Sequence, residues 1–117
     1  MCGISGIFNF SETAPISQED LKSMNTAQSH RGPDAEGYFF GNGIALGHRR
    51  LSIIDVSGGG QPIVSEDNNA VIVFNGEIFN HSQIADELKA KGYHYQTHSD
   101  TETILHAWRE WGVDCLH

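Results

Sequence analysis

Cys2, directly after the initiator methionine, is the residue of this chain with the clearest chemical potential. Processing enzymes generally remove Met1 when the next residue is small, and the mature chain would then begin with a cysteine that carries a free α-amine. An α-amine is a base that can take a thiol proton near neutral pH, so one residue would supply both nucleophile and base. A small buried cysteine that opens a strand is the plainer interpretation, and position 2 alone favours it.

Four further segments are polar and rich in turn residues, and none of them is suited to a hydrophobic core. They are His30-Arg31-Gly32-Pro33-Asp34, Arg50-Leu51-Ser52-Ile53-Ile54-Asp55, Asn75-Gly76-Glu77-Ile78-Phe79-Asn80-His81 and Ser99-Asp100-Thr101-Glu102.

Together with the N-terminal run Cys-Gly-Ile-Ser-Gly-Ile-Phe, these segments closely resemble the class II glutamine amidotransferase domain. More narrowly, they resemble the N-terminal glutaminase domain of glutamine-hydrolysing asparagine synthetases. The resemblance extends from Cys2 to about Gly112, which is nearly the whole chain. It implies an α+β fold, the N-terminal-nucleophile hydrolase sandwich, in which two stacked sheets lie between layers of helices (αββα).

The resemblance also implies an activity, the hydrolysis of glutamine to glutamate and ammonia. Cys2 matches the nucleophile, and its α-amine would protonate the departing ammonia. The side-chain amide of Asn75 and the backbone N–H of Gly76 match the pair of donors that stabilise the oxyanion of the tetrahedral intermediate. Taken without the other motifs, Asn75 is equally typical of a simple turn at the end of a strand.

Three charged residues match the substrate-binding positions of the family. Arg50 matches the arginine that binds the α-carboxylate, which a guanidinium can hold through two hydrogen bonds. Arg49 would point to the opposite face of a strand, so only one of the two arginines can serve. Asp100 matches the ligand of the substrate ammonium, with Glu77 as an assisting carboxylate. The alternative for Asp100 is a carboxylate that only stabilises the first turn of a helix.

Two other polar groups receive no chemical step. The resemblance places the His30–Asp34 loop near the site, where Arg31 and Asp34 could pair with each other or with the substrate. His94 and His98 would share one strand face, but no thiolate or carboxylate lies at zinc-ligand spacing from them. We therefore expect no metal site.

Composition limits the remaining classes of protein. A chain of 117 residues allows one domain, and 15 acidic against 7 basic residues give a net charge of -8, which disfavours nucleic acid as a partner. No apolar run is long enough to cross a membrane, and the N-terminus does not resemble a signal peptide. We expect a cytoplasmic protein, in which Cys115 is a small hydrophobic residue and not a disulfide partner of Cys2.

Hydrophobic patterning predicts one compact unit without repeats or linkers. Strands are expected over residues 2–9, 37–40, 44–47, 50–54, 70–74 and 93–96, with a hairpin at Gly41-Asn42-Gly43. Three helices are expected. The first follows a Ser17/Asp20 cap and has Leu21, Met24 and Ala27 inward, and the second covers about 82–91 and has Ile84, Ala85 and Leu88 inward. The third follows a Ser99/Glu102 capping box and has Ile104, Leu105, Trp108 and Trp111 on one stripe. Gly92 and Gly112 would end the last two helices, and Gly58–Gly60 would turn the backbone before Gln61-Pro62.

The expected domain is residues 1–117 as a partial, C-terminally truncated type 2 glutamine amidotransferase domain. The glutaminase step needs no cofactor, whereas ATP and Mg²⁺ would belong to a synthetase domain that lies outside this chain and amidates aspartate. The expected partners are glutamine and that synthetase domain, with a homodimer of the whole protein left open. An amidotransferase that feeds another acceptor and a non-catalytic binding module stay as alternatives, and we expect the 117-residue chain alone to have little or no activity.

Overall fold

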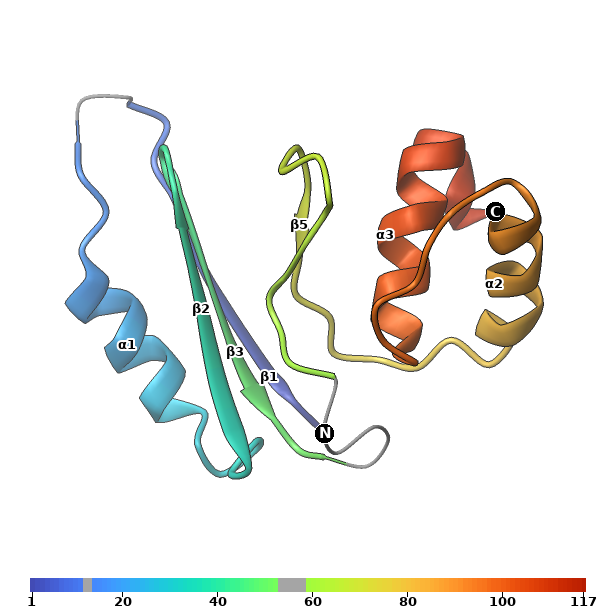
Figure 1. Ribbon diagram of the computed structural model, residues 1–117. Helices are drawn as coiled ribbons and strands as arrows, with labels where there is room; N and C mark the ends of the chain where they lie inside the picture. Colours follow the sequence, from blue (N-terminus) through green and yellow to red (C-terminus); the bar gives the residue numbers. More distant parts are fainter. Residues whose placement is uncertain (12–13, 53–58) are drawn as a thin grey trace.

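The computed structural model describes residues 1–11, 14–52 and 59–117 (Figure 1). The elements follow in the order β1 (Gly3–Phe8), α1 (Gln18–Ala27), β2 (Ala35–Gly41), β3 (Ile44–Arg50), β4 (Ile63–Val64), β5 (Val71–Ile72), α2 (His81–Ala90), α3 (Asp100–Trp111) and a short 3₁₀ helix, η1 (Gly112–Leu116). No helix in these ranges is both long enough and apolar enough to span a bilayer.

β3 is the central strand of a three-stranded antiparallel sheet whose order is β1-β3-β2. Its register pairs Gly3 with Arg49 on one side and Glu36 with Arg49 on the other. The hairpin predicted around Gly41–Gly43 joins β2 to β3 and is confirmed. This register brings the N-terminus of the chain beside the C-terminal end of β3, which carries Arg50.

The remaining elements form layers on the two sides of this sheet. α1 packs against β1 and β3, and α3 contacts both α2 and β5 of the two-stranded β4-β5 sheet. Figure 1 shows α1, the large sheet, the β4-β5 pair and then α3 with α2 in that order across the molecule. The α+β class is therefore confirmed.

α1 begins as predicted but faces the sheet differently. The Ser17 hydroxyl accepts a hydrogen bond from the Asp20 N–H at 3.1 Å, which confirms the cap. The expected inward stripe is wrong at two of its three positions, because Met24 is 41% exposed and Ala27 is also exposed. Leu21 is fully buried as predicted, and Asn25 is the other fully buried residue of this helix. Residues four apart lie on nearly one line of a helix, whereas a repeated step of three drifts around its surface.

The two C-terminal helices confirm their predicted ends. Gly92 and Gly112 follow α2 and α3 with φ of 97° and 58°, a left-handed conformation that glycine adopts without strain. In α2 the inward positions Ala85 and Leu88 are buried. In α3 the predicted stripe is only partly right, because Trp108 is 49% exposed.

The capping box expected at the start of α3 is wrong in one half. Ser99 caps the helix by accepting the Thr101 N–H at 3.1 Å. The buried Glu102 carboxylate does not return to Ser99 but accepts the backbone N–H groups of Gln96 and Thr97, both at 2.7 Å. Residues 93–96 form no strand, so that prediction is wrong as well. The Tyr93 N–H donates to the Leu88 carbonyl oxygen at 3.0 Å, and the Gln96 N–H donates to Glu102.

Two other predicted strands differ in extent. β5 pairs over only Val71–Ile72, although the prediction covered residues 70–74. β3 ends at Arg50, and the predicted continuation over residues 53–54 lies outside the described residues, as do Asp55 and Gly58. β5 ends at Ile72, and two residues later the Gln61 side chain accepts the Phe74 N–H at 2.6 Å.

Candidate active site

One cleft of about 330 Å³ gathers every site residue that the sequence predicts. It lies where the N-terminus, the end of β3, the segment after β5 and the start of α3 converge. Its lining includes Cys2, Arg50, Asn75, Gly76, Glu77 and Asp100, together with Met1, His48, Leu51, Gly59, Gln61, Phe74, His81, His98, Ser99 and Thr101.

Cys2 is half-buried at one end of β1 and is held against the end of β3. The Leu51 N–H points to the Cys2 Sγ at 3.4 Å, and the Sγ lies 3.8 Å from the Leu51 carbonyl oxygen. The Arg31 Nε donates to the Cys2 carbonyl oxygen at 3.2 Å. Cys2 is a free thiol in the cleft, so a nucleophile is available there.

The two consecutive arginines of β3 lie on opposite faces, as strand alternation predicts. Arg50 is 9% exposed and lines the cleft. Arg49 forms an ion pair with Glu36, its cross-strand neighbour, at 2.6 Å and donates to the Gly32 carbonyl oxygen at 3.0 Å. Arg50 is therefore the arginine of this pair that can meet a carboxylate in the cleft.

Asn75 and Gly76 lie shortly after β5, where the chain bends, and both line the cleft; this bend is called the Asn75 turn. The Asn75 side-chain amide and the Gly76 N–H form no hydrogen bond with the part of the chain that the structure describes. The Gln61 Oε1 accepts the N–H of the preceding residue, Phe74, at 2.6 Å. The cleft thus contains two donors without a hydrogen-bond partner among the described residues, and Gln61 holds the backbone just before them.

Asp100 begins α3 and has a partner that the sequence does not predict. Its Oδ2 accepts the Ile78 N–H at 2.9 Å, which connects the loop after Asn75 to the helix. Ser99 provides the helix cap, so Asp100 is not needed for that purpose. Glu77 also lines the cleft and is exposed. One guanidinium and two carboxylates therefore face a common space, which matches the charges of an amino-acid zwitterion.

The His30–Asp34 segment supports the cleft from outside it. Arg31 donates to the Cys2 carbonyl oxygen, and the Asp34 Oδ2 accepts the Ser52 N–H at 2.7 Å. The Asp34 N–H in turn donates to the Arg50 carbonyl oxygen at 3.0 Å. Arg31 and Asp34 thus bind the backbone on both sides of the nucleophile and do not pair with each other.

Sequence reasoning missed His48 and Gln61 as lining residues. His48 is 1% exposed and lies two residues before Arg50, so strand alternation was a signal that could have found it. Burial lowers the pKa of His48, a hydrogen bond with the Phe74 backbone partly offsets this effect, and the nearby Arg50 charge lowers the pKa further. His48 is consequently neutral at neutral pH. No comparable signal marks Gln61, whose partners come from distant parts of the chain.

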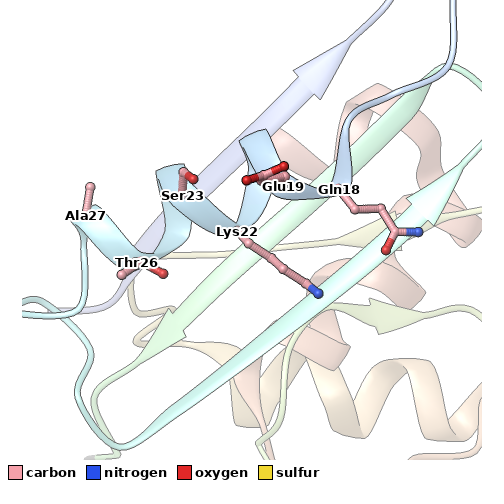
Figure 2. Close-up of a pocket in the computed structure, with 6 residues that line it drawn as sticks. All are labelled: Gln18, Glu19, Lys22, Ser23, Thr26 and Ala27. Carbon is pink, nitrogen blue, oxygen red and sulfur yellow. The ribbon is translucent and has the colours of Figure 1, made fainter.

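A second hollow lies on the exposed flank of α1 (Figure 2). It is lined by Gln18, Glu19, Lys22, Ser23, Thr26 and Ala27. All six residues are exposed and belong to this one helix, and no other element of the described chain contributes a lining residue. Without a nucleophile or a converging set of charges, this surface does not compete with the cleft.

The chain matches the model of the glutamine amidotransferase domain over residues 1–117, and it therefore belongs to that family. It is 47% identical over 113 residues to asparagine synthetase [glutamine-hydrolyzing] 1 of Bacillus subtilis (strain 168), covering 95% of this chain and 18% of that protein. A probable asparagine synthetase [glutamine-hydrolyzing] of Dictyostelium discoideum is 39% identical, with 100% of this chain and 21% of that protein covered. Asparagine synthetase B [glutamine-hydrolyzing] of Escherichia coli (strain K12) is 36% identical, with 99% of this chain and 21% of that protein covered. The chain spans about a fifth of the length of these curated relatives.

Proposed function

We propose that this chain is the glutaminase part of a glutamine-dependent asparagine synthetase, which hydrolyses glutamine to glutamate and ammonia. The observation that carries the proposal is the shared cleft, in which a free thiol, two donors unpaired within the described residues, a guanidinium and two carboxylates converge. The family and the names of the relatives support the same reaction. The amidation of aspartate belongs to the whole protein and is part of the proposal.

In the proposed reaction the Cys2 thiolate attacks the side-chain amide carbon of glutamine and forms a tetrahedral intermediate. The Asn75 amide and the Gly76 N–H donate to its oxyanion, and each such donor contributes about 2.7 to 4 kcal/mol in comparable enzymes. The protonated α-amine of Cys2 gives its proton to the leaving nitrogen. The tetrahedral intermediate then breaks its C–N bond, which releases ammonia and leaves a Cys2 thioester. Water activated by the same amine then attacks the thioester and releases glutamate.

Substrate orientation follows from the charges around the cleft. We assign the glutamine α-carboxylate to Arg50 and its α-ammonium to Asp100, with Glu77 assisting. An amino acid held at both charged groups presents only its far amide to the sulfur. Met1 also lines the cleft, so its removal would both create the α-amine and leave space for substrate.

We further propose that the layered α+β arrangement is the αββα sandwich of N-terminal-nucleophile hydrolases. The order of α1, the large sheet, the β4-β5 pair and α3 supports this assignment. We assign ATP and Mg²⁺ to a synthetase domain outside residues 1–117 and derive no step through either. Association with that domain, a homodimer and a cytoplasmic location stay predictions.

The decisive experiment replaces Cys2 in the complete protein and measures glutamate release and asparagine formation. Cys2→Ala should abolish glutamate release from glutamine while leaving asparagine synthesis from free ammonia intact. Cys115→Ala is the matched control, because it removes the other free cysteine, which lies in η1 outside the cleft. Undiminished glutaminase activity in Cys2→Ala would refute the proposed function.

A further inference from the structure

Gln61 joins the two sides of the cleft through one side-chain amide. Its Oε1 accepts the Phe74 N–H at 2.6 Å, and its Nε2 donates to the Thr101 Oγ1 at 3.2 Å. Phe74 directly precedes Asn75, and Thr101 directly follows Asp100. A single half-buried residue therefore bonds both the residue before Asn75 and the residue after Asp100.

The backbone of Phe74 depends on side chains because β5 ends at Ile72. Gln61 accepts its N–H, and the buried His48 side chain lies close enough to the Phe74 backbone for that backbone to affect the pKa of His48. A longer strand would hold such groups through a regular ladder. Here the position of the Asn75 turn is set by residues that themselves line the cleft.

Gln61 is itself placed by close backbone packing. A Cβ at Gly37 of β2 would collide with the Gln61 carbonyl oxygen, so only glycine at position 37 permits this approach. The backbone of Gln61 therefore packs directly against β2 of the three-stranded sheet, which also contains Arg50 in β3. The Gln61 side chain extends from this fixed point toward the small sheet and α3.

We propose that Gln61 is a positioning residue for glutamine hydrolysis, which sets the separation between the Asn75 turn and the Asp100 end of α3. This inference rests on the proposed function. The two ends of the substrate are bound by different elements, so their separation must match the length of glutamine. A displacement of about 1 Å at a reacting group can cost roughly 10²-fold in rate.

Two substitutions in the complete protein separate the two contacts of Gln61. Gln61→Met keeps a similar shape and removes both hydrogen bonds, whereas Thr101→Val removes only the contact with α3. We expect Gln61→Met to lower kcat for glutamine hydrolysis by about 10- to 100-fold and to raise KM several-fold. Thr101→Val should raise KM roughly 3- to 10-fold and leave kcat within about twofold, since the Phe74 contact remains.

Gln83→Met is the matched control, because Gln83 is exposed on α2 and does not line the cleft. The kcat should be calculated per reactive Cys2, titrated with a glutamine analogue that alkylates thiols, and Tm should be measured for each variant. A purely structural role of Gln61 would lower Tm or the number of reactive sites but leave kcat per site unchanged.

Cys2→Ala in the same series separates failure of this inference from failure of the proposed function. One outcome refutes the role of Gln61 but leaves the proposed function standing. In that outcome Cys2→Ala is inactive, and Gln61→Met has the same kcat per site and the same KM as the control Gln83→Met. If Cys2→Ala retains glutaminase activity, both fail. Should Gln61→Met not fold, Thr101→Val decides the question, and an unchanged KM would overturn the inference.

Discussion

Asp100 carries two contacts that a pair of substitutions can separate. Its carboxylate is the proposed ligand of the glutamine ammonium, and its Oδ2 also accepts the Ile78 N–H at 2.9 Å. Asp100→Asn removes the charge but keeps an acceptor oxygen for Ile78. Asp100→Ala removes the charge and the acceptor, so the loop that follows Asn75 loses its connection to α3.

The size of each effect follows from the strength of the contact. A hydrogen bond to a charged group contributes about 1.5 to 3 kcal/mol, and each 1.4 kcal/mol corresponds to tenfold in an equilibrium constant. Loss of the ammonium contact should therefore raise KM by roughly 10- to 150-fold in both variants. Only Asp100→Ala leaves the Ile78 N–H unpaired, and the resulting shift of the Asn75 turn should lower kcat by about a further tenfold.

The assay is steady-state glutamate release by the complete protein over a wide range of glutamine concentrations. Asp100→Asn should retain kcat within about threefold of the unaltered protein, because an amide oxygen still accepts the Ile78 N–H. Equal kcat values for the Asn and Ala variants would show that the Ile78 contact does not position the oxyanion donors. An unchanged KM in both variants would refute the assignment of Asp100 to the ammonium.

Two further substitutions test the oxyanion donor and the buried histidine. Asn75→Ala should lower kcat by about 10²- to 10³-fold with little change in KM, because an oxyanion donor acts mainly in the transition state, and steady-state kinetics that show only a KM effect would contradict this role. His48, whose pKa is lowered from 6.5 by burial, should bind a proton in the unfolded chain before it does so in the folded chain, so its contribution to stability is complete above pH 6.5 and is lost as the pH falls. Thermal unfolding between pH 7.5 and 5.5 should therefore show a smaller fall of Tm in His48→Gln than in the unaltered protein, and equal slopes would exclude His48 as a source of the pH dependence.

Local signals in the sequence predicted the helix ends and the face of the central strand. The Ser17 hydroxyl caps α1 by accepting the N–H three residues later, and Gly112 ends α3 with a positive φ of its own. Alternation along one strand predicted that only one of Arg49 and Arg50 could face the cleft, and the resemblance to the family selected Arg50. Each of these features is determined within a few residues of the chain, so a linear sequence contains the information.

Contacts between distant segments account for what the sequence did not reveal. Glu102 satisfies the Gln96 and Thr97 N–H groups, and no periodicity in the sequence distinguishes this from a short strand. Gln61 contacts residues 13 and 40 positions away, and a lone amide before a proline gives no indication of either partner. The predicted site residues were found through resemblance, and their supporting contacts required the three-dimensional structure.

The short strand β5 explains why so many polar side chains surround the candidate active site. Two paired residues cannot fix the direction of the chain that follows them, and yet the Asn75 turn has to meet a nucleophile carried by a different sheet. Side chains from two sources supply the missing constraint: Gln61 accepts the N–H of Phe74, just before Asn75, and Asp100 accepts the N–H of Ile78 beyond the turn. A turn held from both sides by cleft-lining residues couples substrate binding to the placement of the oxyanion donors. Substitutions at these supporting positions should consequently change kcat as well as KM, which distinguishes them from residues that only bind the substrate.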